Sequence, residues 1–346
     1  MANLFILVSG ENPSLPFSEV KAIFEAEGVK YQVLEALTQI LRIEAETRCI
    51  KVLVSRSAMA RICGIEIFNC KAEIGEILEN MEESELAPFI GEGESFVVRV
   101  KRVRMSSSDI NTWMLEKAIG DFLFRKLKGK VDLKAPKKTF FGIMTDDRFI
   151  FGLKIAEIKQ EEFLKRGPRK KAFFHPSAMP AKLARCMVNL AQPRMGDLVL
   201  DPFCGTASLL VEASLIGCNV LGLDVKRYMV SGSLRNLTLY GIKPESIVVA
   251  DARSIPLDQA SIDCVVTDPP YGTSATTLKV APRDLIESFL STVGDVIKKR
   301  GRICLAAPKT FKVSETGERM GYKHLESHFI YVHRSLTREI AVFKRG

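Results

Sequence analysis

Hydrophobic and polar residues alternate along this chain with two different periods. Up to residue 158, short segments in which every second residue is hydrophobic, as in strands, alternate with helical segments. Over residues 1–70 the predicted order is strand, helix, strand, strand, helix, strand. From residue 173 the units are longer and each strand is followed by a helix, which predicts a parallel, doubly wound sheet. Residues 326–346 form two strands joined by a tight turn, so the last strand must run antiparallel to its neighbour.

Four segments follow from this pattern. Residues 1–70 predict an α+β, ferredoxin-like domain, and residues 71–158 a second α+β domain with an amphipathic acidic helix at its start. Residues 159–172 are basic and contain Gly and Pro, which predicts a linker. Residues 173–346 predict an α/β, Rossmann-like domain with an antiparallel C-terminal hairpin, which is the shape of methyltransferase domains rather than of dehydrogenases.

Composition narrows the class of protein. The 346 residues carry a formal net charge of +9, which favours a polyanionic partner. The eight cysteines include no CxxC pair, so we expect buried, reduced thiols in a cytoplasmic protein. With only four histidines in addition, we expect no metal site. The apolar N-terminal stretch lacks a basic flank and a cleavage site, and no apolar run is long enough to span a membrane. We read the N-terminus as a strand.

An aspartate closes each of four successive predicted strands. These residues are Asp201, Asp224, Asp251 and Asp268. Ligands of open α/β sheets bind beyond the carboxyl ends of the strands, so four carboxylates at these ends would share one crevice. The alternative is helix capping, because aspartate often precedes a helix after such a turn. One or two aspartates at strand ends could be helix caps, whereas four aspartates at four successive strand ends favour a ligand-binding site.

The loop after the first of these strands, D-P-F-C-G-T-A, indicates the ligand. A dinucleotide fold would carry three spaced glycines for a pyrophosphate, whereas this loop has Gly205 alone and an acid that would repel phosphate. A cationic ligand without phosphate is favoured, and S-adenosylmethionine has an ammonium and a sulfonium group. We expect Asp201, Phe203 and Gly205 to contact it, Asp224 to bind the ribose, and Asp251 with Ala252 to lie at the adenine.

The fourth strand ends in D-P-P-Y, which is Asp268, Pro269, Pro270 and Tyr271. This stretch resembles the signature of methyltransferases that act on exocyclic amino groups of nucleobases. Asp268 and the Pro269 carbonyl would accept both amine hydrogens and localise the lone pair, while Tyr271 would stack on the extruded base. A Pro-Pro turn with an aromatic plug is the structural alternative. A cytosine-C5 mechanism needs a cysteine in this loop, and Cys204 and Cys264 are better explained by core packing.

The carboxylate at position 268 favours guanine over adenine. Guanine presents a ring N–H beside its 2-amino group, and one carboxylate can accept from both. Adenine presents an acceptor beside its 6-amino group, although adenine amino-methyltransferases with this aspartate also exist. The sequence therefore predicts N2 of guanine as the target.

Nearly the whole chain resembles the THUMP-containing tRNA guanine-N2-methyltransferases of the archaeal and eukaryotic guanosine-10 type. The resemblance lies in the N-terminal ferredoxin-like segment and in VVRVKR, AIGDFL, VDLKAP, FIFGLKIAEI, AFFHPSAMPAKLARCMVNLA, DPFCGTAS and TDPPYG. It implies that residues 71–158 are a THUMP domain that grips tRNA. It also implies that His175, Ser177 and Met179 lie near the cofactor, although His175 fits a turn before Pro176 equally well.

Basic residues would then track tRNA phosphates, or else serve only solubility. The candidates are Arg99, Lys101, Lys134, Lys137, Lys138, Lys165, Arg166, Arg169, Lys170 and Lys171. Competing interpretations are a guanine-N2-methyltransferase for another tRNA position or for ribosomal RNA, a DNA amino-methyltransferase, and a non-catalytic tRNA-binding scaffold. Eukaryotic relatives resemble complexes with a small activator subunit, and the chain leaves that partner, the oligomeric state and the choice between mono- and dimethylation open.

Overall fold

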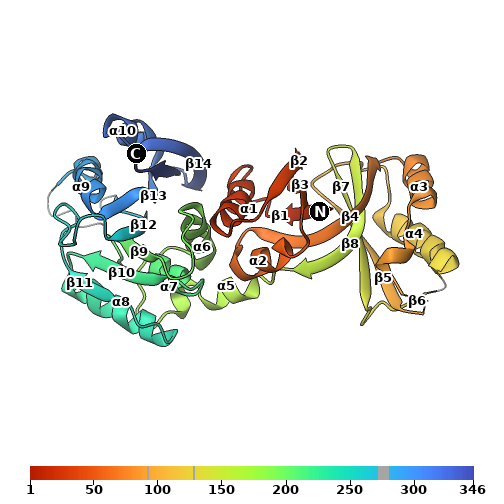
Figure 1. Cartoon of the computed structure of the whole chain (residues 1–346), viewed down its shortest axis with the longest axis horizontal. Coiled ribbons are helices and arrows are strands. Elements are labelled where there is room, and N and C mark those ends of the chain that lie inside the picture. Colours follow the sequence, from red (N-terminus) through yellow and green to blue (C-terminus); the bar gives the residue numbers. More distant parts are fainter. Residues whose placement is uncertain (92, 128, 272–279) are drawn as a thin grey trace. The chain divides into compact units, whose positions relative to one another are not determined.

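The computed structural model describes residues 1–91, 93–127, 129–271 and 280–346 (Figure 1). They divide into two compact units, each of which takes more than one stretch of the chain. The first unit comprises Met1–Pro13, Val29–Val54 and Ala60–Ile158. The second comprises Ser14–Gly28, Ser55–Met59 and Lys159–Gly346.

The first unit is built on one eight-stranded sheet of order β2-β3-β1-β4-β8-β7-β5-β6. Its elements are β1 (Ala2–Val8), β2 (Tyr31–Leu37), β3 (Ile40–Ala45), the start of α2 (Cys49–Arg56), β4 (Ala60–Lys71), α3 (Ile74–Glu83), η1 (Ala87–Phe89), β5 (Ser95–Arg102), α4 (Thr112–Leu127), β6 (Lys130–Val131), β7 (Lys138–Thr145) and β8 (Arg148–Glu157). The boundary expected at residue 70 falls near the end of β4, and the sheet continues across it because β4 pairs with β8.

In this unit β1 lies between β3 and β4 and is antiparallel to both. β7 and β8 form a hairpin that turns at Asp146 and Asp147, which both have positive φ, at 47° and 56°. Two consecutive left-handed residues match the right-handed twist of a hairpin, and Asp tolerates this conformation.

The second unit is a seven-stranded sheet with helices on both faces. Its elements are α1 (Leu15–Ala26), α5 (Glu161–Lys165), η2 (Pro168–Lys170), α6 (Ala181–Leu190), β9 (Leu198–Asp201), α7 (Ser208–Ser214), β10 (Asn219–Asp224), α8 (Arg227–Leu239), β11 (Ser246–Val249), β12 (Ile262–Thr267), α9 (Pro282–Val296), β13 (Ile297–Pro308), η3 (Lys309–Phe311), α10 (Val313–Arg319), β14 (Lys323–His333) and β15 (Leu336–Lys344).

The strand order β11-β10-β9-β12-β13-β15-β14 confirms the predicted sheet. β11 to β13 are parallel, while β15 is antiparallel to both β13 and β14. The chain leaves β9 towards β10 on one side and reaches β12 on the other, so the topological switch point lies between β9 and β12. Helix α9 ends at Val296, because Ile297 is buried and pairs with Ile262 at the start of β13.

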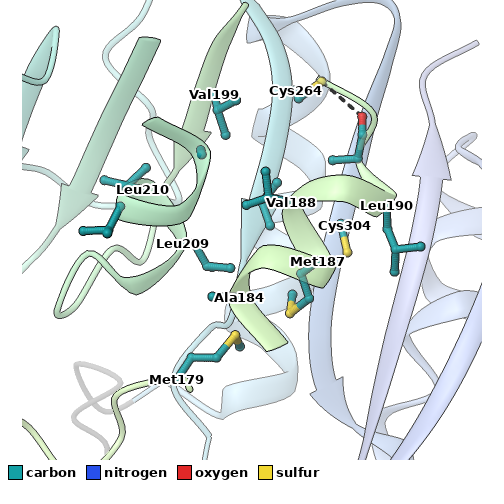
Figure 2. Close-up of a cluster of buried hydrophobic side chains, with 14 of the residues drawn as sticks. Met179, Ala184, Met187, Val188, Leu190, Val199, Leu209, Leu210, Cys264 and Cys304 are labelled. Atoms are coloured by element: carbon teal, nitrogen blue, oxygen red, sulfur yellow. Dashed lines mark hydrogen bonds between the residues drawn. The ribbon is translucent and has the colours of Figure 1, made fainter. Parts of the chain in front are cut away.

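The two faces of this sheet are buried in separate cores, as alternation along a central strand requires. Val199, Val266 and Cys304 face α6 and α7, where they meet Val188 and Leu210 (Figure 2). Leu200, Val265, Ile303 and Leu305 face the opposite side and pack with Phe289 and Val293 of α9. Both faces are closed, and the ligand site is left to the edge formed by the strand ends.

Helix α1 comes from the N-terminal part of the chain but belongs to the second unit. Leu15 and Ala22 enter the core around α6, and Glu19 is fully buried. The Glu19 carboxylate accepts hydrogen bonds from the amides of Ala58 and Met59 at 2.9 and 2.8 Å, from Ser57 Oγ at 2.6 Å and from Asn189 Nδ2 at 2.9 Å. The carboxylate thus joins three segments that are far apart in sequence.

The segment 159–172, expected to be a linker, is ordered within the second unit. It forms α5 and η2, and Phe163 packs with Ala58 and Ala181. Among the described residues, none of the helices combines the length and apolarity that a bilayer span requires.

Candidate active site

One cavity of about 570 Å³ lies at the carboxyl ends of the strands in the second unit, and all four predicted aspartates line it. Asp201 and Asp224 are the last residues of β9 and β10, and Asp268 follows β12 directly. Asp251 comes two residues after β11. The sequence argument that four strand ends converge on one crevice is therefore confirmed in geometry.

Asp201 is the most deeply buried of the four, with 2% of its surface exposed. Its Oδ1 accepts hydrogen bonds from Thr267 Oγ1 at 2.7 Å and from the Phe203 amide at 3.1 Å. Desolvation raises the pKa of Asp201 to about 7, although both hydrogen bonds oppose this shift. A carboxyl group with such a pKa is one that a nearby cation would return to its ionised form.

Asp224 organises the loop between β9 and α7. Its Oδ2 accepts a hydrogen bond from the Gly205 amide at 3.1 Å and its Oδ1 one from the Lys226 amide at 2.9 Å. Gly205 has φ of 51°, a left-handed conformation that lets the loop turn without steric cost from a side chain. Desolvation raises the pKa of Asp224, and each of its oxygens can still accept from a ligand hydroxyl.

Asp251 forms a short, hydrogen-bonded ion pair with a nearby arginine. Arg253 donates from Nη2 to Asp251 Oδ2 at 2.6 Å and from Nε to both oxygens at 3.0 Å. Both side chains are about one-third exposed, and the hydrogen bond from Arg253 lowers the pKa of Asp251. Sequence reasoning missed Arg253, which also lines the cavity.

One oxygen of the Asp268 carboxylate faces a cation. Arg338 Nη2 lies 3.6 Å from Oδ2, whereas Oδ1 is buried and receives no hydrogen bond from the described residues. Desolvation raises the pKa of Asp268, and the charge of Arg338 opposes the shift. Unpaired buried carboxylate oxygens are rare because they lose hydration without compensation, so this one marks a place where a donor from a substrate can bind.

The remaining predicted site residues also line the cavity. They are His175, Ser177, Met179, Phe203, Gly205, Ala252, Pro269, Pro270 and Tyr271. His175 Nδ1 lies 2.7 Å from Ser177 Oγ, and this pair is consistent with either of the readings proposed for His175. Residues 272–279, including the glycine that completes TDPPYG, lie outside the described part of the chain.

The far wall of the cavity was not anticipated. His333, Leu336 and Arg338 reach it from the β14–β15 hairpin. No local motif marks them, since they lie more than 60 residues beyond D-P-P-Y in the sequence. Their only sequence signal was the predicted hairpin itself, which has to pass beside the strand ends.

Neither cysteine near the site is a plausible nucleophile. Burial raises the pKa of Cys264 to about 12, and its Sγ donates to the Ala191 carbonyl at 3.2 Å (Figure 2). Burial likewise raises the pKa of Cys204. All eight cysteines are free and buried, as the sequence predicted.

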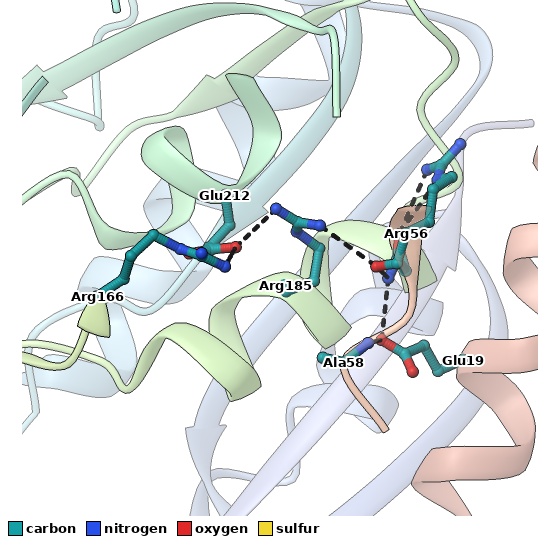
Figure 3. A network of polar contacts seen from close by, with 7 residues as sticks. Glu19, Arg56, Ala58, Arg166, Arg185 and Glu212 are labelled. Atoms are coloured by element: carbon teal, nitrogen blue, oxygen red, sulfur yellow. Dashed lines mark hydrogen bonds and ion pairs between the residues drawn. The ribbon is translucent and has the colours of Figure 1, made fainter. Parts of the chain in front are cut away.

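An ionic cluster holds helix α7, which follows the D-P-F-C-G-T-A loop. Arg166 Nε donates to Glu212 Oε1 at 2.7 Å, and Arg185 Nη2 lies 2.8 Å from Glu212 Oε2 (Figure 3). Glu212 is on α7 and Arg185 on α6, and both are buried. The cluster holds α7 against α6 and so positions the turn at Gly205.

Two of the basic residues predicted to contact phosphate already form polar contacts within the second unit. Arg166 is paired with buried Glu212, and Lys171 Nζ contacts Ser208 Oγ and lies 3.3 Å from Thr206 Oγ1. Burial lowers the pKa of Lys171 to about 8. To bind phosphate, each of these two residues would have to give up a partner inside the second unit.

The other basic candidates remain available to solvent. In the second unit Lys165, Arg169 and Lys170 are exposed, and Lys165 forms an ion pair with exposed Glu162. In the first unit the exposed residues are Lys101, Lys134 and Lys137, while Arg99 and Lys138 are half-buried. Arg99 lies 3.8 Å from Glu116, a partly exposed pair of little energetic weight.

Comparison with known proteins gives a family model and full-length relatives. The model of the RMKL-like methyltransferase domain matches residues 168–340, and a DNA methylase model matches residues 86–234, which end before D-P-P-Y. The chain is 36% identical over 343 residues to the tRNA (guanine(10)-N2)-dimethyltransferase of Methanothermobacter thermautotrophicus, covering 99% of both chains. It is 30% identical to the enzyme of the same name from Pyrococcus abyssi, covering 96% of this chain and 97% of that one.

Solved structures show the same fold at lower identity. TrmN from Thermus thermophilus has a TM-score of 0.58 at 19% identity, covering 99% of this chain and 100% of that one. A methylase of Clostridium difficile 630 has a TM-score of 0.59 at 16% identity, covering 100% and 98%. SMU.472, solved with S-adenosylhomocysteine, has a TM-score of 0.55 at 14% identity, covering 99% and 97%.

Proposed function

The chain belongs to the tRNA (guanine(10)-N2)-methyltransferase family, and from that premise we propose that it transfers methyl groups from S-adenosylmethionine to the 2-amino group of guanosine 10 in tRNA. The observation that carries the proposal for this chain is the buried Oδ1 of Asp268, which has no hydrogen-bond partner in the described part of the chain, beside a cavity lined by three further acids. The cavity thus has an acceptor for an amine next to a binding region suited to a cation.

The residues at the strand ends fit S-adenosylmethionine. Desolvated carboxyl groups with raised pKa values at Asp201 and Asp224 favour a ligand with positive charge, and the Gly205 turn leaves room for close approach of the backbone. We assign the ribose to Asp224 and the adenine to Asp251 and Ala252, with Phe203 and Asp201 in the same binding region. We assign His175, Ser177 and Met179 to the rim of the same site. When bound, this cofactor supplies an electrophilic methyl group on a sulfonium.

Asp268 and its neighbours would prepare the amine. An aromatic amine is a poor nucleophile because its lone pair is delocalised into the ring. Asp268 Oδ1 and the Pro269 carbonyl accept the two amine hydrogens, which favours a tetrahedral nitrogen, and the carboxylate offsets the positive charge that develops on it. Pro269 and Pro270 fix φ and lack amide hydrogens, so no backbone donor of their own competes for the carboxylate.

Guanine fits this arrangement better than adenine does. The Watson–Crick edge of guanine offers N1–H beside the 2-amino group, and a carboxylate can accept from both. Tyr271 lines the cavity and is placed to stack on the extruded base, an interaction of about 1–3 kcal/mol against a flipping cost of a few kcal/mol.

We propose that the first unit binds the tRNA. Its strand order from β2 to β4 supports a ferredoxin-like domain over residues 1–70, although α1 packs in the second unit, and residues 71–158 would be the THUMP domain. Arg99 and Lys101 lie two residues apart on β5 and so share one face, whereas Lys138 pairs with Phe96 and lies on the opposite face of the sheet. We assign Arg99 and Lys101 to phosphate contacts on one face, and Lys134, Lys137 and Lys138 to separate phosphate contacts. Eight buried thiols support a reducing, cytoplasmic setting.

The test is to locate the methyl groups. Unmodified tRNA transcripts are incubated with enzyme and labelled S-adenosylmethionine, and nuclease fragments are analysed by mass spectrometry. We expect one or two methyl groups on N2 of guanosine 10, and the mass also separates mono- from dimethylation. Methyl groups on carbon, on ribose oxygen or on adenine would overturn the proposal. A transcript with inosine at position 10, which lacks the 2-amino group, is the matched control.

A further inference from the structure

Arg338 reaches the candidate active site from β15, and no motif of the family resemblance includes it. Only 14% of its side chain is exposed, and it lines the cavity with Asp268 and Tyr271. Its Nε donates to Tyr271 Oη at 2.6 Å, its guanidinium carbon lies 5.7 Å from the centre of the Tyr271 ring, and its Nη2 lies 3.6 Å from Asp268 Oδ2. One guanidinium therefore contacts both polar side chains of D-P-P-Y.

The contact with Asp268 is asymmetric. Oδ2 faces the guanidinium at a distance too long for a good hydrogen bond but short enough for strong Coulomb attraction in a site of low dielectric constant. Oδ1 is buried and has no hydrogen-bond partner among residues 1–91, 93–127, 129–271 and 280–346. A cation on the Oδ2 side keeps the carboxylate pointed so that Oδ1 stays free for the substrate amine.

On the basis of the proposed function, we propose that Arg338 is a positioning residue that keeps Asp268 ionised and aligned, so that Oδ1 can accept a hydrogen of the guanine 2-amino group. Tyr271 is the second part of this arrangement, because its hydroxyl is held by Arg338 Nε. Arg338 touches neither the transferred methyl group nor the amine in this account. It acts through Asp268 and Tyr271.

Electrostatics supports this role. Desolvation raises the pKa of Asp268, whereas the charge of Arg338 and a hydrogen bond from Tyr271 lower it. A protonated Asp268 could not offset positive charge on the amine nitrogen. Because a nearby opposite charge favours the ionised form of a carboxyl group, the loss of Arg338 should raise the pKa of Asp268.

Other titratable groups face the same cavity and must be separated from Asp268. Asp201 ends β9, Asp224 ends β10, Asp251 with Arg253 follows β11, and Tyr271 follows Asp268 itself. Lys226 precedes α8, His175 lies before α6, and His333 comes from β14. Loss of a nearby positive charge would favour the protonated form of any of these acids, so a shifted pH profile needs an assignment.

The experiment measures single-turnover methylation of unmodified tRNA between pH 5.5 and 9. The Arg338→Met variant removes the charge and the donor at similar length, while Arg338→Lys keeps the charge only. We expect Arg338→Met to move the acid limb of the profile upward by about one pH unit or more, which is about a tenfold loss of rate on the acid side and a smaller loss at pH 9. Arg338→Lys should keep the limb near its original position with a lower plateau.

Tyr271→Phe tests the second contact independently. It should move the limb in the same direction by a smaller amount, since the Arg338 charge remains. If Arg338→Met fails to bind S-adenosylhomocysteine, the test rests on Arg338→Lys and Tyr271→Phe. The proposal would then be overturned if the acid limb of the pH profile does not move in Tyr271→Phe and the plateau rate is unaltered in Arg338→Lys. Arg334→Met, an exposed arginine in the same hairpin, is the charge-matched control and should leave the limb in place.

Assignment to Asp268 comes from repeating the measurement in His333→Gln and Asp201→Asn backgrounds. A shift of the acid limb caused by Arg338→Met that persists in both backgrounds supports the proposal. A shift that disappears in either background overturns it, and so does a loss of rate that is equal at every pH. Wild-type enzyme that transfers no methyl group to guanosine would refute the proposed function itself. Wild-type activity with an unmoved limb in Arg338→Met would refute only the role of Arg338.

Discussion

Replacing Asp201 by asparagine should stabilise the second unit, by an amount that grows as pH rises from about 4 to neutral and is largest at alkaline pH. Asp201 is 2% exposed and its Oδ1 accepts hydrogen bonds from Thr267 and from the Phe203 amide. Asparagine has nearly the same shape and can keep both bonds through its carbonyl oxygen. What it removes is a negative charge whose desolvation raises the pKa of Asp201 to about 7.

The sign and the size follow from proton linkage. A carboxyl group whose pKa is higher in the folded state binds more protons when folded, so its effect on stability is absent below the unfolded pKa and grows as pH rises towards the folded pKa. The pKa of Asp201 goes from 3.8 to about 7 on folding. Because one pKa unit corresponds to about 1.4 kcal/mol, a shift of about three units makes ionised Asp201 destabilising by about 4 kcal/mol.

Urea unfolding at pH 5.0, 6.5 and 8.5 measures this difference, with hydrogen exchange of peptides from β9 and β12 as a report on the second unit alone. We expect Asp201→Asn to exceed wild type by up to about 4 kcal/mol at pH 8.5, with the difference falling steeply towards pH 5. Asp258→Asn removes an exposed aspartate of the same unit and should change little. An Asp201→Asn variant that is less stable than wild type by the same amount at every pH would refute the reasoning.

The remaining predictions concern turnover, packing and RNA binding. Asp268→Asn should lower the single-turnover rate at least about 100-fold with cofactor Kd by calorimetry little changed, and an unaltered rate would contradict the mechanism. Glu19→Ala leaves the buried donors around it unpaired and should lower the free energy of unfolding in urea by at least about 3 kcal/mol. Glu25→Ala on the same helix should lower it by under about 1 kcal/mol, and equal effects of the two variants would count against the burial argument. Arg169→Glu with Lys170→Glu should weaken tRNA binding and reduce its salt slope by about 0.9 for each phosphate that is no longer neutralised, and an unchanged slope would remove these residues from the interface.

The sequence was sufficient for the sheet of the second unit and for one wall of its cavity. Strands that alternate with helices have few topologies open to them, and parallel strands bring their carboxyl ends to one edge. The four aspartates could therefore be placed together from strand ends alone. D-P-P-Y could be assigned a role because its chemistry is local, with the acceptor, the rigid carbonyl and the aromatic ring in four consecutive residues.

The parts that sequence reasoning missed depend on contacts between distant segments. Arg338 meets Asp268 only because β15 lies next to β13 in the sheet, and Arg166 meets Glu212 only because α5 folds back. Charge runs cannot separate such residues from exposed ones: Lys170 and Lys171 are neighbours in sequence, and one is exposed while the other bonds to Ser208. The docking of α1 in the second unit was also hidden, because its amphipathic pattern fits either unit.

That docking sets an order on events while the ribosome makes the chain. Helix α1 ends at Ala26 and its partner α6 begins at Ala181, so about 155 residues must be added in between. At translation rates of about 5–20 residues per second, the wait is roughly 8–30 s. During that time α1 has its apolar side uncovered and is a site for chaperones. For the same reason, a catalytic fragment that starts after residue 158 would lack part of its own core, and expressing it alone should give insoluble protein unless residues 14–28 are supplied.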